Sequence, residues 1–202
     1  MYFLNKILLK LGDWLAYTII LLPVWVFMQE CPPPDTIAVN PIQNSWNIPL
    51  ENEWNKAEVM TWNLKLFPLT NSTINYINEI ISDILPDIIA FQEINNSEAF
   101  NTLANSLPAY GFVNSGSGLA LAVRSDILEI NSHSTLFGDY GYEFAWRYPL
   151  KVDLSWICGI NSTILNIINV HLKSGGDSED YNRRLASCEI LSNYVNNHSN
   201  DN

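Results

Sequence analysis

The sequence has few basic residues. Ten Lys and Arg stand against 21 Asp and Glu, which gives a formal net charge of -11 at pH 7. No basic cluster interrupts this acidic balance, so the chain is not typical of a protein that binds nucleic acid or an anionic membrane through charge alone. An enzyme that meets phosphate through a bound cation is not excluded, because the ion reverses the local field.

Cysteine is also scarce. The three cysteines Cys31, Cys158 and Cys188 form no CxxC pair and no metal-binding spacing. Cys158 lies in an apolar run and Cys188 in a helical one, so we expect both to be small core residues. A disulfide between them stays open if the domain is exported. Internal repeats and low-complexity tracts are absent, and a hydrophobic content of 48% with 12% aromatic residues excludes disorder of the whole chain.

The first 30 residues differ from the rest. Lys6 and Lys10 precede an uninterrupted apolar stretch over residues 14–28, a pattern typical of an export signal or membrane anchor. We expect an uncleaved anchor, with a cleaved signal, a lipid anchor at Cys31 and an apolar helix packed on the domain as alternatives. Residues 31–56 follow as a Pro-rich linker, and residues 57–202 as the folded domain. This order predicts an exported or membrane-anchored protein whose domain lies outside the cytoplasm; no protein partner is evident.

From residue 57 onward, strand patterns outnumber helix patterns, and several strands follow one another without a helix between them. This arrangement predicts an α+β fold with a largely antiparallel core. Helices are expected at 71–85, 97–107 and 179–197, the last with Leu185, Cys188, Leu191 and Val195 on its buried face. Strands are expected at 57–64, 87–92, 119–123, 127–136, 148–157 and 163–170.

Three of these strands end on a polar residue that can bind metal or phosphate. Asn63 follows Trp62, Glu93 closes the run Ile88–Gln92, and His171 follows Val170. A carboxylate at a strand end suits Mg2+, an amide oxygen can assist at the metal, and an imidazole can contact phosphate or transfer a proton. Each residue alone fits an ordinary surface or structural role. Together they predict a metal-assisted phosphate site, whereas His133 and His198 lack such a setting and are expected on the surface.

These motifs resemble the endonuclease/exonuclease/phosphatase superfamily, the deoxyribonuclease I-like fold. The resemblance covers residues 57–195, and its pieces occur in the order of the family: Thr61–Leu64, Pro86–Glu93, Gly118–Arg124, Arg147–Leu150 and Asn169–Ser174. It implies a four-layer α/β sandwich, incomplete at its C-terminus, and a metal-dependent phosphodiester hydrolase of endonuclease type.

The resemblance also implies the roles of single residues. Glu93 would bind Mg2+ or Mn2+, and Asn63 would assist at the metal and the phosphate. His171 would contact the scissile phosphate or act as an acid. Arg147 and Asn169 would face the substrate, a phosphodiester with nucleic acid as one candidate.

Two departures from the family pattern stand out. Gly116-Ser117-Gly118 supplies no glutamate before its strand, and the Asp-x-Asn and Asp-His motifs of the family are absent from this sequence. We therefore expect a fragment of a longer enzyme that is inactive by itself. Alternatives within the superfamily are a phosphatase or a sphingomyelinase-like enzyme, and an alternative of another class is an inactive membrane-tethered remnant. The aromatic residues of the loop 135–146 either stack on bases or cover the edge of the sheet.

Overall fold

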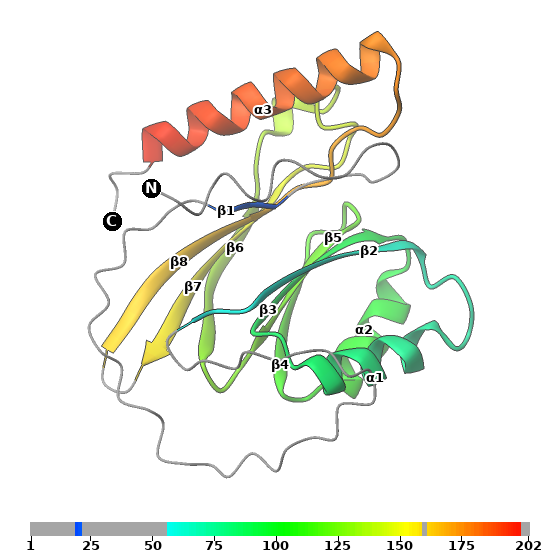
Figure 1. Cartoon of the computed structure of the whole chain (residues 1–202), viewed down its shortest axis with the longest axis vertical. Helices are drawn as coiled ribbons and strands as arrows, with labels where there is room; N and C mark the ends of the chain where they lie inside the picture. Colours follow the sequence, from blue (N-terminus) through cyan, green and yellow to red (C-terminus); the bar gives the residue numbers. More distant parts are fainter. Residues whose placement is uncertain (1–18, 22–55, 159–160, 199–202) are drawn as a thin grey trace.

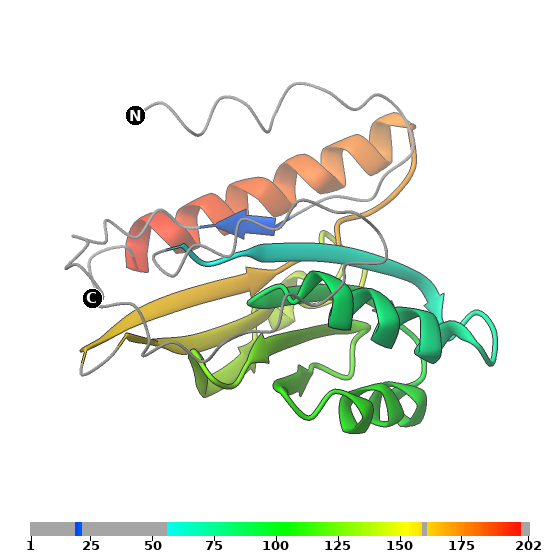
Figure 2. The same ribbon diagram turned by 60° about the horizontal axis from the view of Figure 1, so that its bottom comes forward.

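The computed structural model describes residues 19–21, 56–158 and 161–198. They form two four-stranded sheets that face each other, with helices on the outer side of each (Figure 1). The first sheet has the order β2-β3-β5-β4, and the second has the order β1-β8-β7-β6. Figure 2 shows the same layering from another side, with α1 and α2 beyond the first sheet and α3 beyond the second.

The first sheet consists of β2 (Val59–Phe67), β3 (Ile88–Ile94), β4 (Tyr110–Asn114) and β5 (Leu119–Arg124). Strands β2 and β3 are parallel, joined by helix α1 (Thr73–Ile84), whereas the other pairs are antiparallel. Helix α2 (Ser97–Ser106) begins after Asn96, whose side chain accepts a hydrogen bond from the Ala99 amide. Helix α1 ends at Leu85 in a left-handed conformation, just before Pro86.

The second sheet contains β6 (Leu128–Thr135), β7 (Leu150–Cys158) and β8 (Asn161–Asn169), all antiparallel. A short 3-10 helix, Gly138–Tyr140, lies in the loop between β6 and β7, and α3 (Ser178–His198) follows β8. Strand β1 (Ile19–Leu21) pairs with β8 at the edge of this sheet.

Three apolar clusters hold the layers together, because alternate strand residues face opposite sides of a sheet. Ile88 and Ala90 of β3 face the second sheet, whereas Ile89 and Phe91 face α1 and α2. The outer face of the second sheet packs on α3 through Leu191. The four-layer α+β sandwich expected from the sequence is thereby confirmed.

The elements expected from the sequence are present, with ends shifted by a few residues, but two details differ. Strand β4 was not expected. The buried face of α3 was also wrong in part: Leu185 and Cys188 are exposed, and Ser187 and Leu191 are buried instead. Cys188 is therefore a free surface thiol and not a core residue, while the side chain of Cys158 lies outside the described part of the chain.

The expected N-terminal segment and linker lie almost entirely outside the described residues, apart from the three residues of β1 and Lys56. None of the helices within the described residues is long and apolar enough to cross a membrane. The export or anchor function of residues 1–30 stays a prediction.

Candidate active site

The neighbouring strands β2 and β3 both have an irregularity near the candidate site residues Asn63 and Glu93. Along β3, Ile89, Phe91 and Ile94 all pack in the same cluster against the helices, so the alternation shifts by one residue at Glu93. Glu93 has a left-handed backbone, with φ of 63°. In β2 the register shifts between Asn63 and Phe67, where Lys65 and Leu66 also have positive φ. Such bulges redirect side chains, and here they turn Glu93 away from the helices.

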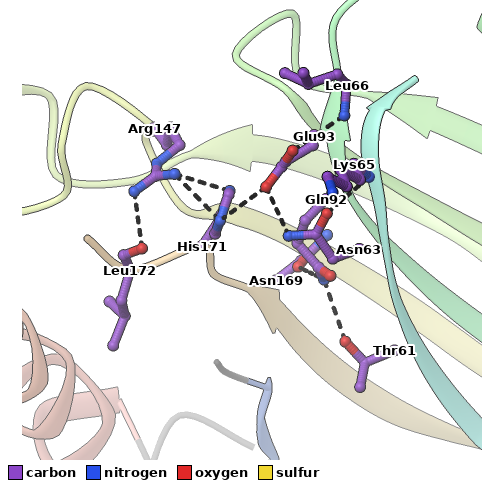
Figure 3. A network of polar contacts seen from close by, with 10 residues as sticks. All are labelled: Thr61, Asn63, Lys65, Leu66, Gln92, Glu93, Arg147, Asn169, His171 and Leu172. Carbon is purple, nitrogen blue, oxygen red and sulfur yellow. Dashed lines mark hydrogen bonds and ion pairs between the residues drawn. The ribbon is translucent and has the colours of Figure 1, made fainter. Parts of the chain in front are cut away.

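The carboxylate of Glu93 is held by donors from β2. Asn63 Nδ2 donates to Glu93 Oε1 at 2.9 Å, and the Leu66 amide donates to Oε2 at 3.0 Å (Figure 3). The Asn63 side chain is itself fixed, because its Oδ1 accepts from the Lys65 amide at 2.9 Å. The strand ends thus bring Asn63 and Glu93 together, as the sequence predicted, and orient the carboxylate before any ligand is present.

His171 faces this carboxylate from the other sheet. Its Nε2 lies 3.8 Å from Glu93 Oε1, and its ring is only 2% exposed. One terminal nitrogen of Arg147 lies 3.2 Å from Nδ1 and 3.1 Å from Nε2, while the other donates to the Leu172 carbonyl at 2.8 Å (Figure 3). A neutral imidazole accepts through one ring nitrogen only, so Arg147 donates to whichever nitrogen is unprotonated.

The electrostatic setting keeps His171 neutral. Burial and, after it, the positive charge of Arg147 lower the pKa of His171 to about 4, against the opposing effect of Glu93. Burial also lowers the pKa of Arg147 from its usual value. At neutral pH the imidazole therefore serves as a hydrogen-bond donor or proton acceptor, and an acid role would first require its protonation.

These side chains line one cleft of about 520 Å³. Glu93, Arg147 and His171 form part of its wall, and the remaining lining residues are Leu66, Ile94, Asn95, Gly116, Ser117 and Gly118. Gly116 and Gly118 have positive φ, which glycine adopts at little cost. The glycine pair was read in the sequence only as the absence of a carboxylate. In the structure it places main chain at the wall of the cleft.

Asn169 lies behind the cleft and not in its wall. It is fully buried, and its Nδ2 donates to the carbonyls of Phe91 and Ala120 at 2.9 Å each. Its Oδ1 accepts from Gln92 Nε2 at 2.9 Å. With the amide engaged in this way, Asn169 does not face a substrate, which corrects the expectation from the sequence. The sequence predicted a buried strand over residues 87–92, but the hydrogen bonds of Gln92 were not foreseen.

The aromatic residues of the loop before β7 have different surroundings. Phe144 is fully buried and stacks on Phe137, so it covers the sheet. The ring of Tyr142 lies under Arg183 of α3, 4.3 Å from the guanidinium carbon. Trp146, beside Arg147, is 69% exposed. His133 and His198 lie on the surface, as expected.

The donor atoms fit Mg2+ or Mn2+ in kind, because these ions prefer carboxylate and amide oxygens and retain several waters. Glu93 is 26% exposed and opens on the cleft, and Asn63 Oδ1 retains a second lone pair. The described part of the chain holds no group of three or more His, Cys, Asp or Glu residues suited to a metal. Within it, Glu93 is the carboxylate that opens on the cleft and could hold such an ion, with water completing the shell. That Asn63 assists at the metal stays a prediction, because its Nδ2 faces Glu93 and its Oδ1 faces the Lys65 amide.

Comparisons with known proteins agree with this fold. The Endonuclease/Exonuclease/phosphatase family model matches residues 60–194, whereas no curated protein matches the chain. The crystal structure of D. rerio TDP2 complexed with single-strand DNA product matches with a TM-score of 0.57 at 13% identity, covering 69% of this chain and 54% of that one. D. rerio TDP2 humanized by 14 mutations matches with a TM-score of 0.55 at 10% identity, covering 69% and 56%.

This chain therefore spans about half the length of those structures, and the likeness to them concerns the fold. The family model matches about two thirds of the chain, over a range that includes Asn63, Glu93 and His171. On the strength of that match, the chain belongs to the endonuclease/exonuclease/phosphatase family and has its deoxyribonuclease I-like fold.

Proposed function

We propose that this site serves metal-dependent hydrolysis of a phosphodiester, in the manner of an endonuclease. One observation carries the proposal. The Glu93 carboxylate is fixed by Asn63 and the Leu66 amide, and its Oε1 faces His171 Nε2 at 3.8 Å in the wall of the cleft. A rigid anionic oxygen beside a neutral imidazole and an arginine suits a phosphate group that is bound through a cation.

Each residue has a distinct part in this proposal. Glu93 and the oxygen of Asn63 would hold Mg2+ or Mn2+, which when bound would neutralise negative charge on the phosphate. His171 would donate a hydrogen bond from its neutral ring to a phosphate oxygen. Arg147 would hold the ring in place and present positive charge to the same group. The negative charge of a bound phosphate would also stabilise the positive charge of Arg147, whose pKa is lowered by burial.

Nucleic acid is the substrate class we favour, and the exposed ring of Trp146 beside Arg147 supports this choice. Aromatic side chains next to a phosphate site can stack on bases, each contributing about 1–3 kcal/mol. The fold neighbour TDP2 was solved with a single-strand DNA product, which is a property of that protein. A phosphatase or sphingomyelinase-like activity, or an inactive domain, is the alternative that the assay must separate.

The experiment measures metal binding first and hydrolysis second. The full chain is titrated with Mn2+ by electron paramagnetic resonance, alongside Glu93→Gln and, as a matched control, Glu129→Gln on the exposed face of β6. We expect Glu93→Gln to lower Mn2+ affinity by about tenfold or more, because a charged ligand is lost, and Glu129→Gln to retain it. Equal affinity in all three proteins would refute the metal assignment.

Hydrolysis is then tested on single-strand DNA, plasmid DNA, sphingomyelin and an inositol phosphate, each with Mg2+ and with a chelator. Cleavage of DNA that depends on both Mg2+ and Glu93 would support the endonuclease proposal. Hydrolysis of one of the other substrates would support that alternative instead. Metal binding without hydrolysis of any substrate would support an inactive domain, either the remnant or the fragment expected from the sequence to be inactive by itself.

We also propose that the apolar N-terminal segment directs export or anchors the domain to a membrane. The support is the sequence pattern of Lys6 and Lys10 ahead of residues 14–28. Fractionation of cells that produce the tagged chain tests this, with a variant that lacks residues 1–30 as control. Recovery of the full chain in the soluble intracellular fraction would contradict the proposal.

A further inference from the structure

Two buried amides join the sheets directly behind the cleft. Gln92 lies in β3 directly before Glu93, and Asn169 is the last residue of β8, two positions before His171. Gln92 is 4% exposed and Asn169 is fully buried. Their side chains meet at 2.9 Å, from Gln92 Nε2 to Asn169 Oδ1 (Figure 3).

Both amides are bonded to several strands. Besides its bond to Asn169, Gln92 Nε2 lies 3.1 Å from the Ala90 carbonyl and 3.2 Å from Thr61 Oγ1 on β2. Asn169 reaches the carbonyls of Phe91 on β3 and Ala120 on β5, which are register partners. One polar cluster thus connects three neighbouring strands of the first sheet to a strand of the second.

We propose that the Gln92–Asn169 pair is a positioning device that sets the spacing between Glu93 and His171. Glu93 and His171 belong to different sheets, and most of the contact between these sheets is apolar. Apolar packing is non-directional, so by itself it permits small shifts of one sheet over the other. Hydrogen bonds fix direction and distance, and buried amides lose free energy when a bond is broken. The role rests on the function proposed above, since it concerns the same two side chains.

The demand for such a device follows from the geometry of the site. Glu93 and His171 do not share a short hydrogen bond, because their nearest nitrogen and oxygen are 3.8 Å apart. Their separation is therefore set by the strands that carry them. In an active site a displacement of about 1 Å can cost about a hundredfold in rate, so a directional link beside both residues has a functional consequence.

Gln92→Met tests the proposal, because methionine fills similar space without a hydrogen-bonding amide. The matched control is Tyr110→Phe, which removes another buried hydrogen bond of the first sheet, from Tyr110 Oη to the Pro86 carbonyl at 2.9 Å. Pro86 precedes β3, so this bond lies at the end of the strand away from Glu93. Both variants remove a buried bond and should lower Tm, but only Gln92→Met removes the link beside the site.

Crystal structures of the two variants measure the distance between Glu93 Oε1 and His171 Nε2, and kinetics with bis(p-nitrophenyl) phosphate measure kcat and KM. We expect Gln92→Met to change the distance or give two conformers, and to lower kcat about tenfold or more with little change in KM. Tyr110→Phe should leave distance and kcat unchanged. If Gln92→Met lowers Tm but retains the wild-type distance and kcat, the amide pair is structural only and the proposal is refuted.

A milder variant serves if Gln92→Met does not fold. Thr61→Val removes only the hydroxyl contact to Gln92 from an exposed position, so the fold should persist. A smaller change in the same distance is expected, and an unchanged distance would count against the proposal. The crystallographic result does not depend on turnover. Failure of the positioning role is therefore distinguishable from failure of the hydrolase proposal, in which the wild-type chain itself shows no hydrolysis.

Discussion

His171 is neutral because of its surroundings, and this property can be tested by changing one neighbour. Burial and then Arg147 lower the pKa of His171 to about 4, while Glu93 opposes them. We expect Arg147→Gln to raise the pKa of His171, since the repelling charge is gone while Glu93 remains. Titration of the His171 ring resonances by NMR in the metal-free chain measures this shift. Arg124→Gln, at the far end of β5, is the control, and an equal pKa in wild type and Arg147→Gln would contradict the argument.

The same shift has a consequence for stability. When the pKa of a histidine is lower in the folded state, the unfolded chain takes up the proton at a higher pH than the folded chain does. Between the usual pKa near 6.5 and the folded value of about 4, protonation therefore favours unfolding. We expect the free energy of unfolding of wild type to fall as pH decreases through this window, and to fall less in His171→Asn. Urea unfolding at several pH values measures the difference, and parallel curves would contradict it.

Asp153 has a dependence of the same sign at lower pH, because its folded pKa is also lowered. Burial alone would raise the pKa of Asp153, but hydrogen bonds from Lys151 and Ser132 lower it below 3.8. Its stabilising effect is present above its usual pKa and is lost as pH falls through the lower folded value. Asp153→Asn should therefore cost about 1 kcal/mol at pH 7 and progressively less toward pH 3. Urea unfolding at both pH values measures this, and an equal cost at both would contradict the assignment.

The loop that follows β8 depends on a glycine. Gly175 has φ of 119°, and a Cβ there would overlap the Asp180 carboxylate, which pairs with Lys173 at 2.8 Å. Gly175→Ala must either move Asp180 or rearrange the backbone, so we expect a loss of about 2 kcal/mol in the free energy of unfolding. Gly176→Ala is the matched control, because open space surrounds its Cβ position. Similar stability of the two variants would show that the loop adapts freely.

The elements themselves were largely predictable from the sequence, because apolar periodicity and helix ends are local signals. Strand β4 was not, since Tyr110–Asn114 is short and contains Gly111. The buried face of α3 was misplaced because the helix packs through polar contacts as well as apolar ones. Ser187 is fully buried and donates to the Glu143 carbonyl, a contact that hydrophobic periodicity does not reveal.

The proximity of the main candidate residues was predictable from the sequence, but the geometry between them was not. Strand ends brought Asn63, Glu93 and His171 together, and the motif before β7 added Arg147. Their orientation depends on positive φ at Glu93 and at Leu66, which only the three-dimensional structure reveals. The family resemblance implied that Asn169 faces the substrate, but its side chain lies between the two sheets, where its amide is hydrogen-bonded to Gln92, Phe91 and Ala120.

At the scale of the whole molecule, the acidic charge opposes the substrate that the site is proposed to bind. With a net charge of -11, the protein repels a polyanion over distances of about a Debye length, near 10 Å at 0.1 M salt. A basic nuclease loses affinity for DNA as salt increases. For this chain, in contrast, added salt screens a repulsion.

We therefore expect kcat/KM for a DNA oligonucleotide to rise severalfold between about 20 mM and about 200 mM NaCl at fixed Mg2+. The rise should appear mainly in KM, because approach is affected more than the bound complex. Bis(p-nitrophenyl) phosphate carries a single negative charge and serves as control, with a much smaller rise. A fall of kcat/KM with salt for DNA would mean that a local positive surface outweighs the net charge. Arg147, whose guanidinium lines the cleft, would then be the first residue to substitute.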